Sequence, residues 1–129
     1  MSGRKLDLLA LGLAGGEYLL NRLWLRQSTG SWLHRFLVCW ANDVFAGVFM
    51  LAWLNLLLGL AGLRRLRSVR WAALFLVVCA LVWEVAAPVF KPGAVFDLWD
   101  FAAYQAGGLL YLAGDAIRIN HAALQRKTR

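Results

Sequence analysis

The feature that most constrains the fold is a run of twenty residues without a charge, VFAGVFMLAWLNLLLGLAGL, from Val44 to Leu63. As an α-helix it would be about 30 Å long, the thickness of the hydrocarbon core of a bilayer. The whole chain has 129 residues, of which 61% are hydrophobic and only 16% are charged. A soluble domain of this length cannot bury so much apolar surface. The sequence therefore predicts that the chain folds in lipid.

Three further apolar stretches have the length of a membrane span, at residues 6–24, 71–90 and 98–117, beside the run at 44–63. The first is the weakest. Its polar residues are Asp7, Glu17, Asn21 and Arg22. We interpret it as an uncleaved helix, with signal-peptide cleavage after the AGG tripeptide at residues 14–16 as the alternative. The expected fold class is all-α: a polytopic membrane protein whose four transmembrane helices form a single domain, residues 1–129.

Residues 22–40, RLWLRQSTGSWLHRFLVCW, connect the first two spans and are only moderately polar. Trp24, Trp32 and Trp40 stand among basic residues there. Tryptophan is enriched at membrane interfaces, and basic amphipathic segments lie on the surface of a bilayer. The pattern predicts a short interfacial helix on the outer surface.

Basic residues are distributed unevenly between the two sides of the predicted bundle. With the N-terminus inside, the inner segments carry Arg4, Lys5, Arg64, Arg65, Arg67, Arg70, Arg118, Arg126, Lys127 and Arg129, and the outer segments carry Arg22, Arg26, Arg35 and Lys91. The positive-inside rule then places both termini in the cytoplasm. This arrangement accounts for the net charge of +7 without a nucleic-acid partner.

Acidic residues gather at the opposite, outer level, where we expect Glu17, Asp43, Glu84, Asp97 and Asp100. Only Asp7 and Asp115 fall near the inner surface. On the fourth span a spacing of three or four residues puts five residues on one helix face. They are Asp97, Asp100, Tyr104, Gly107 and Tyr111.

Glu84 is too deep in its span to cap a helix, and an intramembrane carboxylate costs roughly 2.5–3.5 kcal/mol, so it indicates function. An interhelical hydrogen bond from Tyr104 or Gln105 is the structural alternative. For the other outer acids, capping is an open alternative: Asp97 with Asp100 for the fourth helix, and Asn42 or Asp43 for the second. Carboxylates alone suit hard cations, so Mg²⁺ or Ca²⁺ at this cluster is one expectation, and no cofactor is the other.

Glycines and amides inside the spans indicate helix packing. Gly12, Gly16, Gly47, Gly59, Gly62, Gly107, Gly108 and Gly114 are positions where helices in lipid could approach closely. Asn55 and Gln105 are expected to hydrogen-bond between helices. We expect no disulfide between Cys39 and Cys79, because one lies near a membrane surface and the other near the middle of a span.

The stretch "WE" followed by a proline and then FDLWDFAAYQAGG resembles the signature of VanZ-like membrane proteins, as does WANDVFAG upstream, which matches at Asn42 and Asp43. The other matching positions are Glu84, Lys91, Gly93, Asp97, Asp100, Tyr104, Gly107 and Gly108. The resemblance covers roughly residues 40–111. It implies a small multi-pass protein of the bacterial inner membrane, in a family named for low-level resistance to teicoplanin-type glycopeptides and without an established biochemical activity.

Three functions follow from these patterns. The first is an outward-facing acidic pocket, formed by Glu84, Asp97, Asp100, Tyr104 and Asp43, that binds or acts on a cell-envelope component whose anionic head group Lys91 contacts. The second is a small proton-coupled multidrug exporter with Glu17 as coupling group. The third is a non-catalytic scaffold or accessory subunit. The sequence shows no group of residues typical of a catalytic nucleophile, so we do not assign an enzymatic activity. The sequence does not determine the oligomeric state.

Overall fold

The computed structural model describes residues 2–24, 40–90 and 98–127, with the side chains of residues 84, 85, 87–90 and 98 outside that description. These ranges contain no strand and four α-helices, α1 (Gly3–Leu23), α3 (Asn42–Leu60), α4 (Val69–Phe90) and α5 (Leu98–Lys127). The all-α prediction is confirmed. Residues 25–39 of the predicted interfacial helix lie outside the described residues, as do Lys91, Gly93 and Asp97.

The helix lengths and compositions bear on the number of membrane spans. Among the described helices, α3 is long and apolar enough to cross a membrane, and α4 has a shorter apolar stretch, Val69–Trp83. The four-span arrangement stays a prediction.

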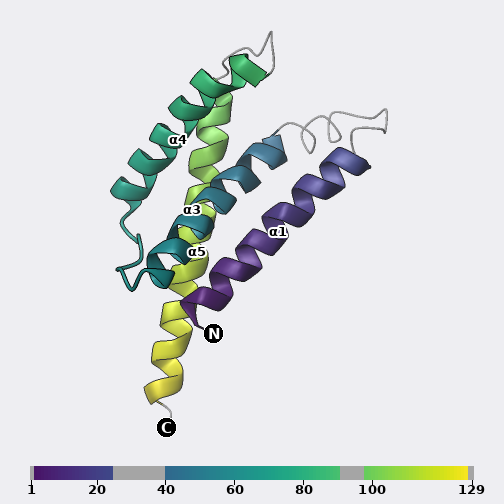
Figure 1. Cartoon of the computed structure of the whole chain (residues 1–129). Coiled ribbons are helices and arrows are strands. Elements are labelled where there is room, and N and C mark those ends of the chain that lie inside the picture. Colours follow the sequence, from purple (N-terminus) through teal and green to yellow (C-terminus); the bar gives the residue numbers. More distant parts are fainter. Residues whose placement is uncertain (1, 25–39, 91–97, 128–129) are drawn as a thin grey trace.

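The central helix of the bundle is α3. It packs against α1 on one side and α5 on the other, while α4 packs mainly on α5. Both termini and the connection between α3 and α4 lie at one end of the bundle, beyond which the last turns of α5 extend (Figure 1). We call this the inner end, after the predicted orientation, and the opposite end the outer end.

Two glycines explain why α3 and α5 lie so close together. A Cβ atom added to Gly47 would overlap the backbone of Tyr104, and one added to Gly107 would overlap the backbone of Val44. The packing role predicted for these two glycines is therefore confirmed. At Gly12, Gly16, Gly59 and Gly114, by contrast, an added Cβ would meet nothing within 4 Å among the described residues, so no described helix approaches closely there.

The inner end of α3 stops earlier than the apolar run predicts. The Leu63 N–H bonds to the Leu58 carbonyl at 2.8 Å, the Gly62 N–H bonds to the Gly59 carbonyl at 3.4 Å, and Gly62 has a φ of 72°. This is a Schellman motif, which needs a left-handed residue that glycine supplies without strain. The helix thus ends at Leu60 rather than at Leu63.

The outer end of α3 corrects a capping hypothesis. The N-cap position is Ala41, which makes no side-chain capping bond, so Asn42 and Asp43 are the first two helical residues and not caps. For α5, Asp100 lies in the first turn as predicted.

Candidate functional site

A cavity of about 450 Å³ lies toward the outer end of the bundle and is lined from all four helices. Its lining residues are Ala14, Gly15, Glu17, Tyr18, Asn42, Asp43, Phe45, Ala46, Phe49, Met50, Trp83 and Tyr104. The volume and the mostly apolar wall with few polar groups are those of a small-molecule site. We call it the outer cavity.

The outer cavity brings together three of the residues singled out from the sequence. Glu17 comes from α1, Asp43 from the first turn of α3, and Tyr104 from the buried face of α5. Asp100 is half-buried one turn earlier on α5 and does not line the cavity. For the rest of the predicted site, Lys91 and Asp97 lie outside the described residues, and so does the side chain of Glu84. Trp83, which precedes Glu84, lines the cavity.

Glu17 has the most unusual surroundings of the three. Its side chain forms a hydrogen bond with Asn21, one turn further along α1. Its Oε2 atom is buried and has no hydrogen-bond partner among the described residues. An acceptor left without a donor costs free energy, so a ligand or a proton at this oxygen would relieve that cost.

The expected cation site is not assembled from the described residues. Within residues 2–24, 40–90 and 98–127, no group of three His, Cys, Asp or Glu side chains is placed to hold a metal ion. Mg²⁺ or Ca²⁺ at the cluster that includes Glu84 and Asp97 stays a prediction.

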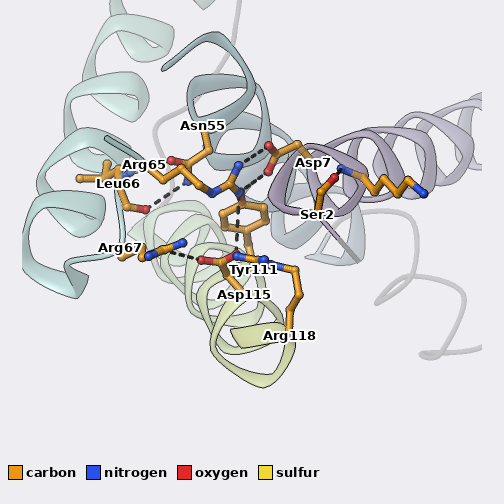
Figure 2. A network of polar contacts seen from close by, with 10 residues as sticks. Ser2, Asp7, Asn55, Arg65, Leu66, Arg67, Tyr111, Asp115 and Arg118 are labelled. Carbon is orange, nitrogen blue, oxygen red and sulfur yellow. Dashed lines mark hydrogen bonds and ion pairs between the residues drawn. The ribbon is translucent and has the colours of Figure 1, made fainter. Parts of the chain in front are cut away.

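A second polar centre, at the inner end, was not predicted from the sequence (Figure 2). Asp7 on α1 is completely buried and accepts hydrogen bonds from Arg65 in the α3–α4 connection, at 2.5 Å from Nη1 and 2.6 Å from Nη2. Tyr111 on α5 donates its hydroxyl to Asp7 at 2.5 Å and accepts from Arg65 Nη2 at 2.8 Å. The hydrogen bond with Asp7 raises the pKa of the Arg65 guanidinium above its ordinary value, so Arg65 is charged.

Asp115 continues this inner cluster one turn along α5. It accepts from Arg67 Nε at 3.0 Å and from Arg118 Nη2 at 2.8 Å, and Arg65 Nη2 lies 3.8 Å away. Three guanidinium groups therefore surround one nearly buried carboxylate. We call Asp7, Arg65, Arg67, Tyr111, Asp115 and Arg118 the inner cluster.

The two amides predicted to join helices behave differently. Gln105 on α5 donates to the carbonyl of Ala73 on α4 at 3.3 Å, as expected. Asn55 on α3 has two roles. Its Nδ2 donates to the Leu66 carbonyl at 3.1 Å and its Oδ1 accepts from the Leu66 N–H at 2.6 Å, which holds the α3–α4 connection. Its side chain also hydrogen-bonds with Tyr111 on α5, so the predicted interhelical role is confirmed.

A signal for the inner cluster was present in the sequence. The face of α5 defined by Tyr104, Gly107 and Tyr111 is buried and reaches Asp115 by one more step of four. At the same level stand Asp7 and the arginine-rich connection RRLRSVR. Acids and arginines at one level of a bundle pair readily, since a lone charge is costly there.

Comparisons with protein-family models, curated proteins and solved structures find no match to this chain. The VanZ-like resemblance therefore depends on the quoted motif residues alone.

Proposed function

We propose that the chain is a polytopic membrane protein of VanZ-like type, with both termini in the cytoplasm of a bacterial cell. The distribution of side chains supports a lipid environment. Trp53, Trp71 and Leu110 are 49%, 64% and 62% exposed, whereas Asp7 and Asn55 are almost completely buried. In water this pattern would leave a large apolar surface exposed, whereas in lipid it hides the polar groups.

The outer cavity is proposed to bind an amphiphilic component of the cell envelope. The observation that carries this proposal is the meeting of Glu17, Asp43 and Tyr104 in one cavity of about 450 Å³ whose walls include Phe45 and Trp83. Two carboxylates favour a ligand with a cationic or hydroxyl-bearing head, and the aromatic walls favour an apolar body. By resemblance, the consequence for the cell would be low-level resistance to teicoplanin-type glycopeptides.

A second candidate function is proton-coupled export of lipophilic cations. The buried, unpartnered Oε2 of Glu17 favours it, because a carboxylate in an apolar cavity can exchange a proton for a cationic substrate. The same cavity would serve, so the two functions differ in whether the ligand is moved across the membrane.

The test uses cells that express the wild type, Glu17→Gln or Gly12→Ala. The last is a control on the same helix but outside the cavity, at a position where an added Cβ meets nothing within 4 Å among the described residues. We expect teicoplanin resistance with the wild type and with Gly12→Ala, and its loss with Glu17→Gln. No resistance from the wild type, or equal resistance from all three, contradicts the envelope function.

A parallel measurement decides for or against export. Proteoliposomes that contain the wild type are given an inward or outward pH gradient, and uptake of tetraphenylphosphonium is followed. Uptake that depends on the gradient and disappears in Glu17→Gln assigns transport. Gradient-independent binding of the same probe supports the cavity as a static binding site.

A further inference from the structure

A second hollow lies between α4 and α5, toward the inner end. Its volume is about 160 Å³, and its walls include Val69, Ala72 and Ala73 from α4 and Gly108 and Leu112 from α5. Small residues on both helices leave this space open. It extends from Val69 to Leu76 along α4, about 10 Å at the rise of an α-helix. We call it the inner groove.

The inner mouth of the groove is marked by arginines. Arg67 precedes α4 by two residues, and its Nε lies 3.0 Å from Asp115, which follows the groove residue Leu112 by three positions on α5. The side chain of Arg67 is 53% exposed. Among the described residues, its Nη groups have no partner, and the exposed Arg70 in the first turn of α4 has none either.

Positive charge exceeds negative charge at this end. The described part of the inner end carries seven basic side chains and two acidic ones, counted over residues 2–7, 61–70 and 111–118. Asp7 and Asp115, the two acids, are already paired inside the inner cluster. The start of α4, a helix of 22 residues, adds the partial positive charge of a helix N-terminus. The mouth of the groove therefore attracts an anion from the same side of the membrane.

We propose that the inner groove binds one anionic phospholipid of the inner leaflet. Arg67 and Arg70 hold the phosphate of the head group, and the first part of an acyl chain lies along Ala72, Ala73 and Leu112. Guanidinium groups bind phosphate through paired, charge-assisted hydrogen bonds, and basic pockets between transmembrane helices are known sites for acidic lipids. The proposal depends on the membrane location proposed above but not on any ligand of the outer cavity.

Charge complementarity favours an anionic lipid over other occupants. A zwitterionic lipid would bring its cation next to the same arginines. A soluble acidic protein would contact the arginines but would leave unfilled the apolar groove, which continues about 10 Å toward the middle of the bundle. An anionic lipid satisfies both halves of the site at once.

The test uses full-length protein in nanodiscs that contain equal amounts of phosphatidylglycerol and phosphatidylcholine. Native mass spectrometry after release counts the lipids that stay bound. Three variants are compared with the wild type: Arg67→Gln with Arg70→Gln, Ala73→Leu to fill the groove, and Arg4→Gln with Lys5→Gln as a control. The control removes the same charge at the same end from α1, which does not line the groove.

The wild type and the control are expected to retain one phosphatidylglycerol and to discriminate against phosphatidylcholine. Each charge-assisted hydrogen bond lost from the head group should lower retention about tenfold, so the groove double variant should lose the lipid. Ala73→Leu should lose it with all arginines in place. Equal retention of both lipids by the wild type, or equal losses in the two double variants, overturns the proposal. A wild type that does not incorporate into nanodiscs refutes the membrane location itself.

Discussion

The strongest prediction concerns the pair of Asp7 and Arg65 in the inner cluster. The side chains of these residues are 1% and 15% exposed, and Asp7 accepts two hydrogen bonds from Arg65 and one from Tyr111. Removing one partner of a buried ion pair usually costs about 3–5 kcal/mol, because the remaining charge is left without compensation. In Asp7→Leu, Arg65 keeps its bond to Tyr111 and its proximity to Asp115. We therefore expect a loss near the lower limit, about 3 kcal/mol.

Arg65→Met should cost a similar amount, since Asp7 then keeps only the bond from Tyr111. The double variant removes both charges, takes from Tyr111 its two charged partners but not Asn55, and removes Arg65 from beside Asp115. Its loss should therefore also be about 3 kcal/mol and not the sum of the two single losses. The coupling free energy between the two sites would then be about 3 kcal/mol.

The assay is equilibrium unfolding of the four proteins in mixed micelles, followed by far-ultraviolet circular dichroism. A coupling free energy below about 0.5 kcal/mol is typical of an exposed ion pair. Such a value would refute the reasoning, because it would mean that water reaches Asp7 in the folded protein.

The remaining predictions use the same unfolding assay. Gly107→Ala should lose about 2 kcal/mol, because the added methyl forces α5 away from α3, whereas the control Gly12→Ala should be neutral or slightly stabilising; equal effects would contradict the close approach of α3 and α5. Asn55→Leu should lose about 2 kcal/mol by removing two hydrogen bonds to the α3–α4 connection, and an unchanged midpoint would argue against that contact. Gln105→Leu should cost less, about 0.6 kcal/mol, since in the proposed membrane setting a single interhelical hydrogen bond is weak. A loss as large as that of Asn55→Leu would contradict this estimate.

Much of the fold could be predicted because long apolar runs and helix-ending residues are local signals. The run from Val44 and the spacing from Tyr104 to Tyr111 placed a helix and its buried face directly. The buried residues of α1 are Asp7, Ala10, Ala14 and Asn21, and their spacing does not match an apolar pattern. Their face is small and polar, and the usual rule assigns apolar residues to the core. In a bundle with an apolar exterior the informative periodicity is that of small and polar residues.

The candidate site could be predicted in part. The sequence indicates Glu17, Asp43 and Tyr104 as candidates, but it assigns Glu84 to the acidic pocket and Glu17 to a separate exporter function. A carboxylate in the middle of an apolar run can be recognised from the sequence of that run alone. The cavity that surrounds Glu17 cannot, because it depends on how α1 is rotated relative to α3. The inner cluster was missed for a related reason: Arg65 is 58 residues from Asp7, and Tyr111 is 104 residues from it. No pattern within a single helix encodes such a contact.

The long separations in the inner cluster also impose an order on biosynthesis. Asp7 leaves the ribosome first, and at about 5–20 residues per second its arginine partner follows roughly 3–12 seconds later. Tyr111 and Asp115 come last of all. During that interval the Asp7 carboxylate lacks its cation, and burying it in an apolar environment would cost free energy. The nascent helix is therefore more stable where Asp7 stays in contact with water or with the insertion machinery. In the proposed membrane setting, the buried position of Asp7 is therefore tied to synthesis of the α3–α4 connection, which supplies Arg65.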